Sequence, residues 1–440
     1  MRREEFIFEK YEADKAKGEF RFYYSLGGEI DFVEKLSVDR ESVIWKNVNR
    51  ELLDAVLFNS HLMLGISYWK TYCPEKITVN SGKLNKEQAE FWNKLYTNGL
   101  GEFFYKNKID FRGLVKFPYS GHKTVSVKFK AKDRAIVPFG GGKDSAVTAE
   151  LLKRNKNDFI LFGLNTSRVQ RQAAKIAGKK TVIIKRELDK GLFKLNKAGA
   201  YNGHIPITAV YSFVSLLASA LYNYKYIVFS NEQSANYGNL KYLNHIVNHQ
   251  YSKSFEFEND FRAYLKKYIS PDIVYFSLLR PFSEFKIAEL FSEHKKYFDC
   301  FSSCNRNFTI NGKSEKRWCG KCPKCAFVFS QLSAFVPKKE LIKIFGKNLY
   351  QDKKLLSVFL ELWEEKKIKP FDCVGEEEEV LRASYAALNA KEYDNDYIIN
   401  YFKSNILPKR KDMAKKFKKE PGQSREHNIP TEFTRIIKNL

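Results

Sequence analysis

The sequence predicts an α/β fold with a doubly wound parallel sheet, and three observations support this. Short apolar runs recur from about residue 134, as RAIVPF, DFILFGLN, KTVIIKR, KYIVFSN and IVYFSLL. Segments of helical character separate these runs, and strands that alternate with helices are typical of a parallel sheet covered on both faces. The 440 residues are 44% hydrophobic and 15% aromatic, which is enough to bury one large core or two moderate ones.

Three regions are predicted along the chain. Residues 1–125 alternate aromatic and polar positions in EFRFYYSLGGEIDFVEKL, which predicts a separate β-containing region with a turn at Gly27-Gly28. Residues 130–335 form the α/β catalytic domain. Residues 336–440 form a helical, charged extension that ends in a basic tail, KRKDMAKKFKKEPGQSREHNIP. We expect this tail to be solvated or to rest on a polyanion.

One uncharged stretch, Ile205 to Tyr222, is nearly long enough to cross a bilayer. Its hydroxyl side chains, Pro206 near its start and the strand-like KYIVFS directly after it favour a buried helix, so no membrane span is expected. The first residues, MRREEFIFEKYEADK, lack the apolar centre and cleavage site of a secretory signal. We therefore expect a cytoplasmic protein.

The formal net charge of +25 suggests a polyanionic partner, such as nucleic acid, an anionic membrane surface or a phosphorylated small molecule. Lysine, asparagine, phenylalanine and tyrosine are all plentiful, however, and an AT-rich genome produces this composition without selection for binding. The charge alone does not choose among these partners, and the sequence assigns no oligomeric state.

A glycine-rich loop, Gly140-Gly141-Gly142-Lys143-Asp144-Ser145, joins the apolar run RAIVPF to the helical AVTAELLKR. A strand, a glycine-rich turn and a helix in this order present backbone N–H groups and a helix N-terminus to phosphate. The loop is not a Walker A motif, because Val137 stands at that motif's first glycine and Asp144 follows Lys143. It is not a dinucleotide fingerprint either, because Ser145 replaces the last glycine. The alternative is a tight turn with Asp144 as N-cap, but three glycines cost backbone entropy that a plain turn does not need.

The loop resembles the SGGxDS loop of the N-type ATP pyrophosphatases, which cleave ATP between the α and β phosphates and pass AMP to a substrate oxygen. This resemblance implies an α/β fold of the adenine-nucleotide alpha-hydrolase type. It also implies that the three glycines approach the phosphates, that Lys143 and Ser145 contact pyrophosphate, and that Asp144 holds Mg²⁺ or caps the helix. Gly140 stands where that loop usually has serine, which removes one hydroxyl contact and keeps the backbone cradle.

Four of the seven cysteines are clustered, as Cys304, Cys319, Cys322 and Cys325. Their spacing can close around one tetrahedral metal ion, and zinc in a structural role is the first expectation. An iron–sulfur cluster is the competing interpretation, because some sulfur-transferring pyrophosphatases carry one on clustered cysteines. For the remaining cysteines, Cys73, Cys300 and Cys373, the default is a buried small hydrophobic side chain.

A pyrophosphatase loop followed by a four-cysteine knuckle is also found in the 7-cyano-7-deazaguanine synthases, so further segments are needed to choose a family. Nine segments occur in this order along the chain: LGISYWKTYCP, GLGEFFYKN, AYNGHIPITAV, FSNEQSAN, VNHQYSKSFEFE, YFSLLRPFSE, SCNRNF, WCGKCPKCAFVF and KPFDCVGE. Together they resemble the UDP-N-acetylmuramoyl-L-alanyl-L-glutamate epimerase family, the MurL-type enzymes of peptidoglycan synthesis. The resemblance covers about residues 60 to 385 and leaves the first 50 residues and the basic tail unplaced.

The family resemblance implies that ATP and Mg²⁺ are used to invert the terminal L-glutamate of UDP-MurNAc-L-Ala-L-Glu, with release of AMP and pyrophosphate. A free α-carboxylate resists formation of a carbanion beside it. An acyl-adenylate has lost that charge and can delocalise electrons into its carbonyl, so its α-proton can be removed by a positioned base.

Six polar residues within the resembling segments are candidates for this chemistry: His204, Glu232, His249, Lys253, Glu256 and Arg280. His204 and His249 are candidates for base or acid, because imidazole titrates near neutral pH. Lys253 and Arg280 suit carboxylates or pyrophosphate. Glu232 directly follows a predicted strand end, where α/β sheets place their sites. Each of these residues can instead be a hydrogen-bonded core side chain or part of a surface ion pair.

Two other functions remain alternatives. A pyrophosphatase that adenylates tRNA or a nucleobase would use the positive charge on a phosphate backbone, although the sequence contains no recognisable RNA-binding module. The other is a regulatory module that binds a nucleotide without converting it, and the replacement of the usual loop serine by Gly140 would fit this function.

Overall fold

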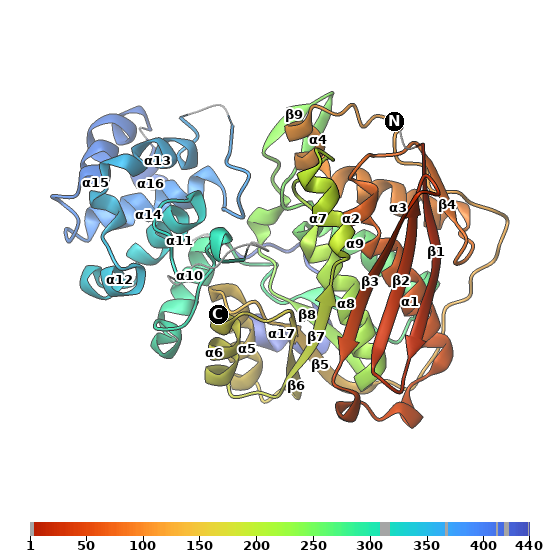
Figure 1. The fold of residues 1–440 in the computed structure, drawn as a ribbon. Coiled ribbons are helices and arrows are strands. Elements are labelled where there is room, and N and C mark those ends of the chain that lie inside the picture. The colour runs from red at the N-terminus through yellow and green to blue at the C-terminus, as the bar shows by residue number, and fades with distance from the viewer. Residues whose placement is uncertain (1–3, 309–316, 366–367, 411, 418–421, 439) are drawn as a thin grey trace.

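The computed structural model describes residues 4–308, 317–365, 368–410, 412–417, 422–438 and 440, and Figure 1 shows their arrangement. One large sheet runs through this described part of the chain, with nine strands in the order β11-β8-β5-β6-β7-β3-β2-β1-β4. Its strands are β1 (Glu5–Asp14), β2 (Glu19–Leu26), β3 (Ile30–Val38), β4 (Lys76–Val79), β5 (Lys132–Pro138), β6 (Phe159–Leu164), β7 (Thr181–Glu187), β8 (Tyr224–Phe229) and β11 (Val274–Ser277). A small ribbon pairs β9 (Leu240–Tyr242) with β10 (His245–Val247).

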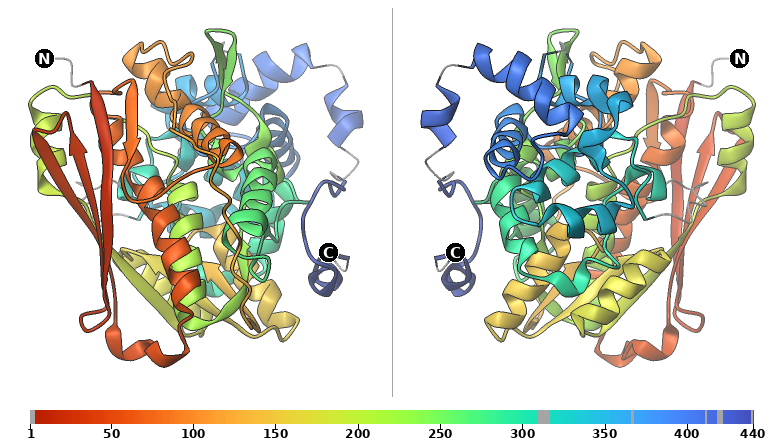
Figure 2. Two further views of the ribbon diagram at one scale, coloured as in Figure 1. Left: turned by 90° about the vertical axis from the view of Figure 1, so that its right-hand side faces the viewer. Right: turned by 90° about the vertical axis from the view of Figure 1, so that its left-hand side faces the viewer.

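Helices cover the sheet and form the C-terminal part of the molecule (Figure 2). Those of the described residues are α1 (Arg50–Leu64), α2 (Ile66–Trp69), α3 (Lys86–Gly99), α4 (Gly101–Asn107), α5 (Lys143–Arg154), α6 (Arg168–Ala177), α7 (Lys190–Lys197), α8 (Ile207–Tyr222), α9 (Phe255–Tyr264), α10 (Glu284–Ser292), α11 (Pro323–Ser333), α12 (Lys338–Phe345), α13 (Leu356–Leu362), α14 (Glu377–Asn389), α15 (Tyr397–Tyr401), α16 (Met413–Phe417) and α17 (Thr431–Lys438).

The parallel half of the sheet has a doubly wound strand order. Its five strands pair in parallel as β11-β8-β5-β6-β7, which is 5-4-1-2-3 when they are numbered along the chain. The five apolar runs are therefore strands, and the mixed α/β class with a mostly parallel sheet is confirmed. Because the winding reverses between β5 and β8, the loops that follow these strands lie at the switch point, where open α/β sheets bind ligands.

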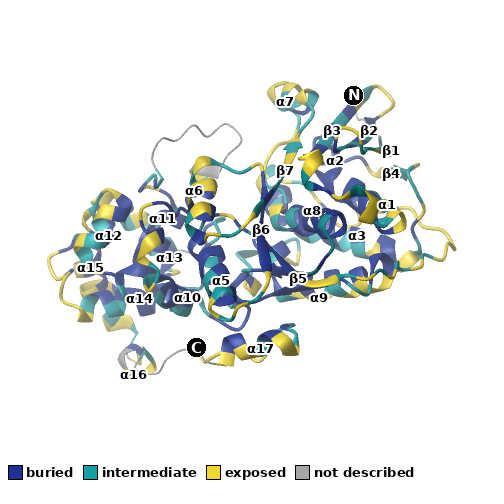
Figure 3. Ribbon diagram, turned by 90° about the horizontal axis from the view of Figure 1, so that it is seen from below, coloured by how far each residue is buried: buried dark blue, intermediate teal, exposed yellow. Residues whose placement is uncertain are grey.

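Both faces of the parallel strands are buried, because successive residues of each strand pack into different cores. In β5, Ala135 and Val137 belong to one core, whereas Ile136 belongs to the other. The first core includes residues of α5 and α11, and the second includes residues of α8 and α1. Figure 3 shows β5 and β6 as buried strands between these two groups of helices.

The predicted N-terminal region does contain strands, and Gly27 and Gly28 form the turn between β2 and β3 with φ angles of 63° and 67°. The region is not a separate sheet, however. Residues 35–38 of β3 pair antiparallel with residues 184–187 of β7, so the N-terminal strands extend the parallel sheet (Figure 1). This pairing satisfies backbone groups that β7 would otherwise expose at a sheet edge.

The uncharged stretch from Ile205 forms α8, a largely buried helix of 16 residues, as predicted. Within the described ranges, no helix is both long and apolar enough to cross a membrane.

The C-terminal extension is helical, as predicted, but its basic tail is not simply solvated. Met413 and Ile429 interrupt the charged residues and are buried. The Ser424 N–H donates to the carbonyl of Pro281 at 2.9 Å, and the tail leads into α17, whose Phe433 ring lies 4.9 Å from that of Tyr226. Residues 411 and 418–421 of the tail lie outside the described residues. The apolar side chains explain why the described part packs onto the sheet.

Candidate active site

The predicted phosphate loop connects β5 to α5 at the switch point of the sheet. Gly142 is the N-cap residue of α5, and within the described ranges no side chain caps this helix, so Asp144 is not its N-cap. The first N–H groups of a helix have no intrahelical partner and attract anions. Gly141 has a φ of 73°, and a Cβ added at Gly140 would meet nothing within 4 Å. The loop therefore places the exposed Gly140 beside a helix N-terminus, which is the arrangement that phosphate binding requires.

The side chains of the loop take different positions. Lys143, expected to contact pyrophosphate, is fully buried and forms ion pairs with Asp144 and Glu284. Ser145 donates its hydroxyl to the carbonyl of Gly142 at 3.1 Å. The side chain of Asp144 is 23% exposed, against 0% for Lys143 and 1% for Glu284. Asp144 is thus the charged group of this network that a ligand can reach.

Two further lysines keep Asp144 ionised. Burial alone would raise the pKa of Asp144, but attraction to Lys143, Lys324 and Lys253 lowers it. Lys324 also lies 3.7 Å from a carboxylate oxygen of Glu284. The loop therefore presents a carboxylate, surrounded by buried cations, next to open backbone donors.

We expect Gly141→Ala to impair ATP binding. An alanine at this positive φ costs about 1–2 kcal/mol, and its Cβ would lie 3.0 Å from the Cα of Gln170, a backbone atom that cannot move aside alone. Calorimetric titration with ATP and thermal denaturation would measure both effects. Gly178→Ala is the matched control, because Gly178 has a φ of 67° and a Cβ there would lie 4.0 Å from its nearest neighbour. Wild-type affinity in Gly141→Ala would contradict a phosphate-binding role.

Arg280, which follows β11, contacts the segment that follows β8 on the other side of the switch point. It is 1% exposed, and its guanidinium donates to the carbonyls of Glu232 at 2.7 Å and Lys253 at 2.6 Å. It also pairs with the buried Glu258 at 3.0 Å. Arg280 thus positions the backbone of two predicted site residues, Glu232 and Lys253. Glu232 itself is buried directly beyond the end of β8, where the sequence placed it.

Several buried polar atoms near this point have no hydrogen-bond partner among the described residues. They are Ser230 Oγ, Ser234 Oγ, Gln250 Oε1 and Lys369 Nζ. Ser230 and Ser234 lie in the segment that follows β8, and Gln250 donates its amide to the carbonyl of Val374 at 3.1 Å. Buried polar groups are nearly always hydrogen-bonded in folded proteins. These atoms are therefore free to hydrogen-bond to water or to a bound polar molecule.

The predicted histidines meet at a third group of residues. The rings of His204 and His249 are 4.5 Å apart, and both face Glu102 of α4. His249 Nδ1 hydrogen-bonds to Glu102 Oε2, and His204 Nδ1 lies 3.4 Å from the same oxygen. On its far side, His249 Nε2 lies 3.7 Å from the sulfur of Cys373. Carboxylate, imidazole and thiol are therefore connected in a row.

The charges in this row stabilise one another. Burial alone would raise the pKa of Cys373, but Lys253 and His249 lower it to about 6. Burial alone would lower the pKa of His249, but Cys373 and Glu102 raise it to about 9. The pKa of Glu102 falls to about 2, because the two histidines outweigh its burial. Near neutral pH the row is a thiolate, an imidazolium and a carboxylate.

The row lies beside the phosphate loop. Lys324 donates to the carbonyl of Cys373 and also faces Glu284, the buried partner of Lys143. Burial would lower the pKa of Lys253, but the charges of Cys373 and of the carboxylates around the loop raise it. One network of charges thus connects the thiol to the loop.

The structure places the predicted catalytic residues unequally. His204, Glu232, His249 and Lys253 belong to this network, whereas the side chain of Glu256 is 55% exposed and pairs with Lys94 at 2.7 Å. Glu256 is therefore not brought to the site.

Sequence reasoning missed Glu102, Glu284, Lys324 and Cys373. Cys373 is not the buried hydrophobic side chain that the default predicts. It is partly exposed, and its sulfur forms a hydrogen bond with His249 Nε2. Cys73 and Cys300 are buried, as expected. The available signal was that all four lie in resembling segments, namely GLGEFFYKN, YFSLLRPFSE, WCGKCPKCAFVF and KPFDCVGE.

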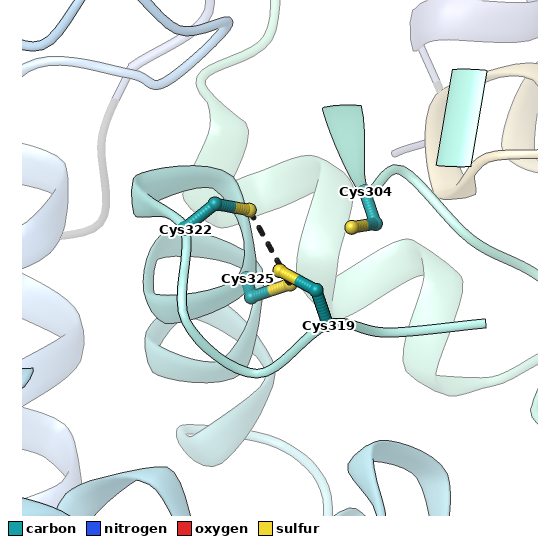
Figure 4. Close-up of side chains that lie close together, drawn as sticks. All are labelled: Cys304, Cys319, Cys322 and Cys325. Carbon is teal, nitrogen blue, oxygen red and sulfur yellow. Dashed lines mark hydrogen bonds between the residues drawn. The ribbon is translucent and has the colours of Figure 1, made fainter. Parts of the chain in front are cut away.

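The four clustered cysteines converge, as predicted (Figure 4). Their sulfur atoms all lie within 4.8 Å of one another, and Cys325 Sγ is 3.6 Å from Cys319 Sγ and 3.5 Å from Cys322 Sγ. In a tetrahedral zinc site with Zn–S bonds of about 2.3 Å, sulfur atoms are about 3.8 Å apart. The donor set and the spacing therefore fit a metal ion.

Comparison with known proteins identifies the family. A model of the MurL N-terminal domain matches residues 1–278, and a model of the MurL C-terminal domain matches residues 300–417. A protein of Xanthomonas oryzae pv. oryzae is 36% identical over 405 residues, covering 92% of this chain and 90% of that protein. A protein of Salinispora tropica is 36% identical over 388 residues, covering 87% of this chain and 84% of its own length. Both are named UDP-N-acetyl-alpha-D-muramoyl-L-alanyl-L-glutamate epimerase. This chain therefore belongs to the MurL family of epimerases and is an isomerase.

Proposed function

We propose that this enzyme uses ATP and Mg²⁺ to epimerise the terminal L-Glu of UDP-MurNAc-L-Ala-L-Glu to D-Glu in peptidoglycan biosynthesis. The reaction proceeds through an acyl-adenylate and releases AMP and diphosphate. The observation that carries this proposal is that Lys324 connects the network of the glycine-rich loop to the row of Glu102, His249 and Cys373. The names of the relatives support the substrate.

The residues of the network suit binding of both the nucleotide and the substrate. Nucleotide phosphates would meet the backbone donors of residues 140–142 and the N-terminus of α5. Asp144 and Glu232 supply the carboxylate oxygens that Mg²⁺ prefers, and the ion would neutralise charge on the phosphates. Lys253 and Lys369 are cations that can attract the carboxylates of the substrate.

Activation of the carboxylate explains why a phosphate loop belongs in an epimerase. Attack of the glutamate α-carboxylate on the α-phosphorus of ATP forms the mixed anhydride and releases diphosphate. The product has lost the carboxylate charge, so its α-proton becomes removable by a base beside it. Return of a proton to the other face and hydrolysis then give D-Glu and AMP.

The cysteine knuckle is proposed to hold a structural zinc ion. All four ligand positions would be filled by protein, which leaves no open position for catalysis.

The proposal predicts coupled products in D₂O. Incubation of the protein with ATP, Mg²⁺ and UDP-MurNAc-L-Ala-L-Glu should release AMP, introduce deuterium at the glutamate α-carbon and form D-Glu. Liquid chromatography would quantify AMP, and mass spectrometry with chiral analysis would follow the glutamate. AMP without deuterium would retain adenylation and contradict epimerisation. No response to this substrate would contradict the proposal and direct the same assay to tRNA.

A further inference from the structure

The row of Glu102, His249 and Cys373 contains a thiol to which no sequence pattern assigns a role. We propose that Cys373 is the catalytic base that removes the α-proton from the adenylated glutamate, with His249 and Glu102 as positioning residues. This inference rests on the proposed function and names the group that performs its proton transfer.

Cys373 is held in a fixed position beside the loop. Lys324 donates to its carbonyl, and Gln250 donates to the carbonyl of the next residue, Val374, at 3.1 Å. Its sulfur lies 3.7 Å from His249 Nε2. Lys324 also faces Glu284 at 3.7 Å, which ties the cysteine to the loop that would form the adenylate. Lys324 thus holds the backbone of Cys373 and contacts the buried carboxylate of the loop network, which keeps the thiol close to the activation site.

Other groups of the network are less suited to accept a proton. Lys253 stays protonated at neutral pH, because nearby anions raise its pKa. His249 is also protonated at neutral pH, because its pKa is raised to about 9. Burial, together with the charge of His249, lowers the pKa of His204 to about 3, which makes it a weak base. The charged groups that face Cys373 are His249, Lys253 and Lys324, and against its burial they lower its pKa to about 6. A thiolate is therefore present at neutral pH, and its conjugate acid is close to that pH, as general-base catalysis requires.

The step balances in atoms and electrons. The Cα–H bond breaks, an S–H bond forms on Cys373, and the electron pair moves into the carbonyl of the acyl-adenylate. A second acid, in exchange with solvent, then donates a proton to the opposite face of Cα. The thiol returns its proton to solvent, so the enzyme is restored and the α-carbon is inverted.

The central test separates adenylation from proton transfer in Cys373→Ala. In D₂O with ATP, Mg²⁺ and UDP-MurNAc-L-Ala-L-Glu, we expect this variant to lose deuterium incorporation and D-Glu formation by about 10³-fold. Substrate-dependent exchange of diphosphate into ATP should stay within about threefold of wild type, because the loop is untouched, and this exchange also reports correct folding. Cys73→Ala is the matched control, because Cys73 is a buried thiol outside the network.

A pH profile tests the positioning residues. For wild type, deuterium incorporation should rise with an apparent pKa of about 6, since the thiolate is lost below it. Glu102→Gln removes the anion that stabilises the imidazolium of His249. The thiolate of Cys373 then loses a neighbouring cation, so its pKa should rise and the rising limb of the pH profile should move to higher pH. Alkylation of Cys373 by iodoacetamide, followed by peptide mass spectrometry, should show the same shift without any substrate.

The outcomes distinguish the two proposals. Wild-type protein that makes no AMP would contradict the proposed function, and this inference with it. Deuterium incorporation retained in Cys373→Ala would overturn the base assignment alone. A covalent glutamyl thioester on Cys373, detected by intact mass, would also overturn it, because the cysteine would then be a nucleophile. An unchanged pH profile in Glu102→Gln would contradict the positioning role.

Discussion

Asp144→Asn should reduce AMP formation by about 10³-fold while leaving the protein folded. Asp144 is the charged residue of the loop network that a ligand can reach, and its lowered pKa keeps it ionised. Asparagine preserves the shape and removes the charge that would hold Mg²⁺ against the phosphates. Deuterium incorporation should fall in parallel, because no acyl-adenylate forms. Single-turnover release of AMP from radiolabelled ATP measures the effect.

Stability provides the check on this variant. The ion pair of Lys143 with Glu284 remains, so the free energy of unfolding should fall by no more than about 1–3 kcal/mol. Asp133→Asn is the matched control, because Asp133 is 77% exposed and belongs to β5, which leads into the same loop. AMP release at the wild-type rate in Asp144→Asn would contradict a role of this carboxylate in nucleotide chemistry.

The parts of the site that the sequence predicted are local in the chain. The loop of residues 140–145 and the knuckle of Cys319, Cys322 and Cys325 each lie within seven consecutive residues, so their spacing alone indicates their chemistry. Backbone donors at a strand-to-helix turn and thiols on a tight turn need no distant partner to be recognised. The structure places the loop between β5 and α5 and brings the sulfur atoms of the knuckle together.

The parts that the sequence did not predict depend on distant pairs. Glu102 lies 147 residues before His249, and Cys373 lies 124 residues after it. Periodicity indicates which residues share one helix face or one strand face, but it does not say which loops meet at a sheet edge. The same limit applies to Lys143, whose buried partner, Glu284, is 141 residues away. The local spacing of the loop does not indicate that Lys143 pairs with a buried carboxylate on another segment.

The fold also combines features that local sequence patterns predict with features that depend on distant parts of the chain. Apolar runs identified the five parallel strands, because both of their faces are buried. Alternation likewise identified the strands of the N-terminal region, and Gly27-Gly28 identified their turn. The pairing of β3 with β7 was not predictable, because hydrogen bonding between strand edges is made by the backbone and leaves no mark in the side-chain pattern.

The second large effect is expected at the cysteine knuckle. Cys304, Cys322 and Cys325 are buried in the same core as Trp318 and Phe301, so the knuckle forms part of the packing on one side of the sheet. A tetrathiolate there needs a metal ion to compensate its charge, and binding of a structural zinc ion contributes directly to the free energy of folding. Loss of one ligand should therefore release the metal and loosen this core.

We accordingly expect Cys325→Ser to lose its zinc and to unfold about 4 °C below the wild type, which corresponds to roughly 4 kcal/mol for a chain of this length. Metal analysis of purified protein by plasma mass spectrometry and thermal denaturation measure the two quantities. Cys300→Ser is the matched control, because Cys300 is a buried neighbour in the same core that donates to the carbonyl of Tyr297 at 3.4 Å, outside the knuckle. It should keep one zinc ion per chain. Iron with visible absorbance in the wild type would show that the knuckle holds an iron–sulfur cluster and not zinc. An unchanged unfolding temperature in Cys325→Ser would contradict any structural metal, because a buried four-thiolate site cannot lose a ligand without destabilising the core around it.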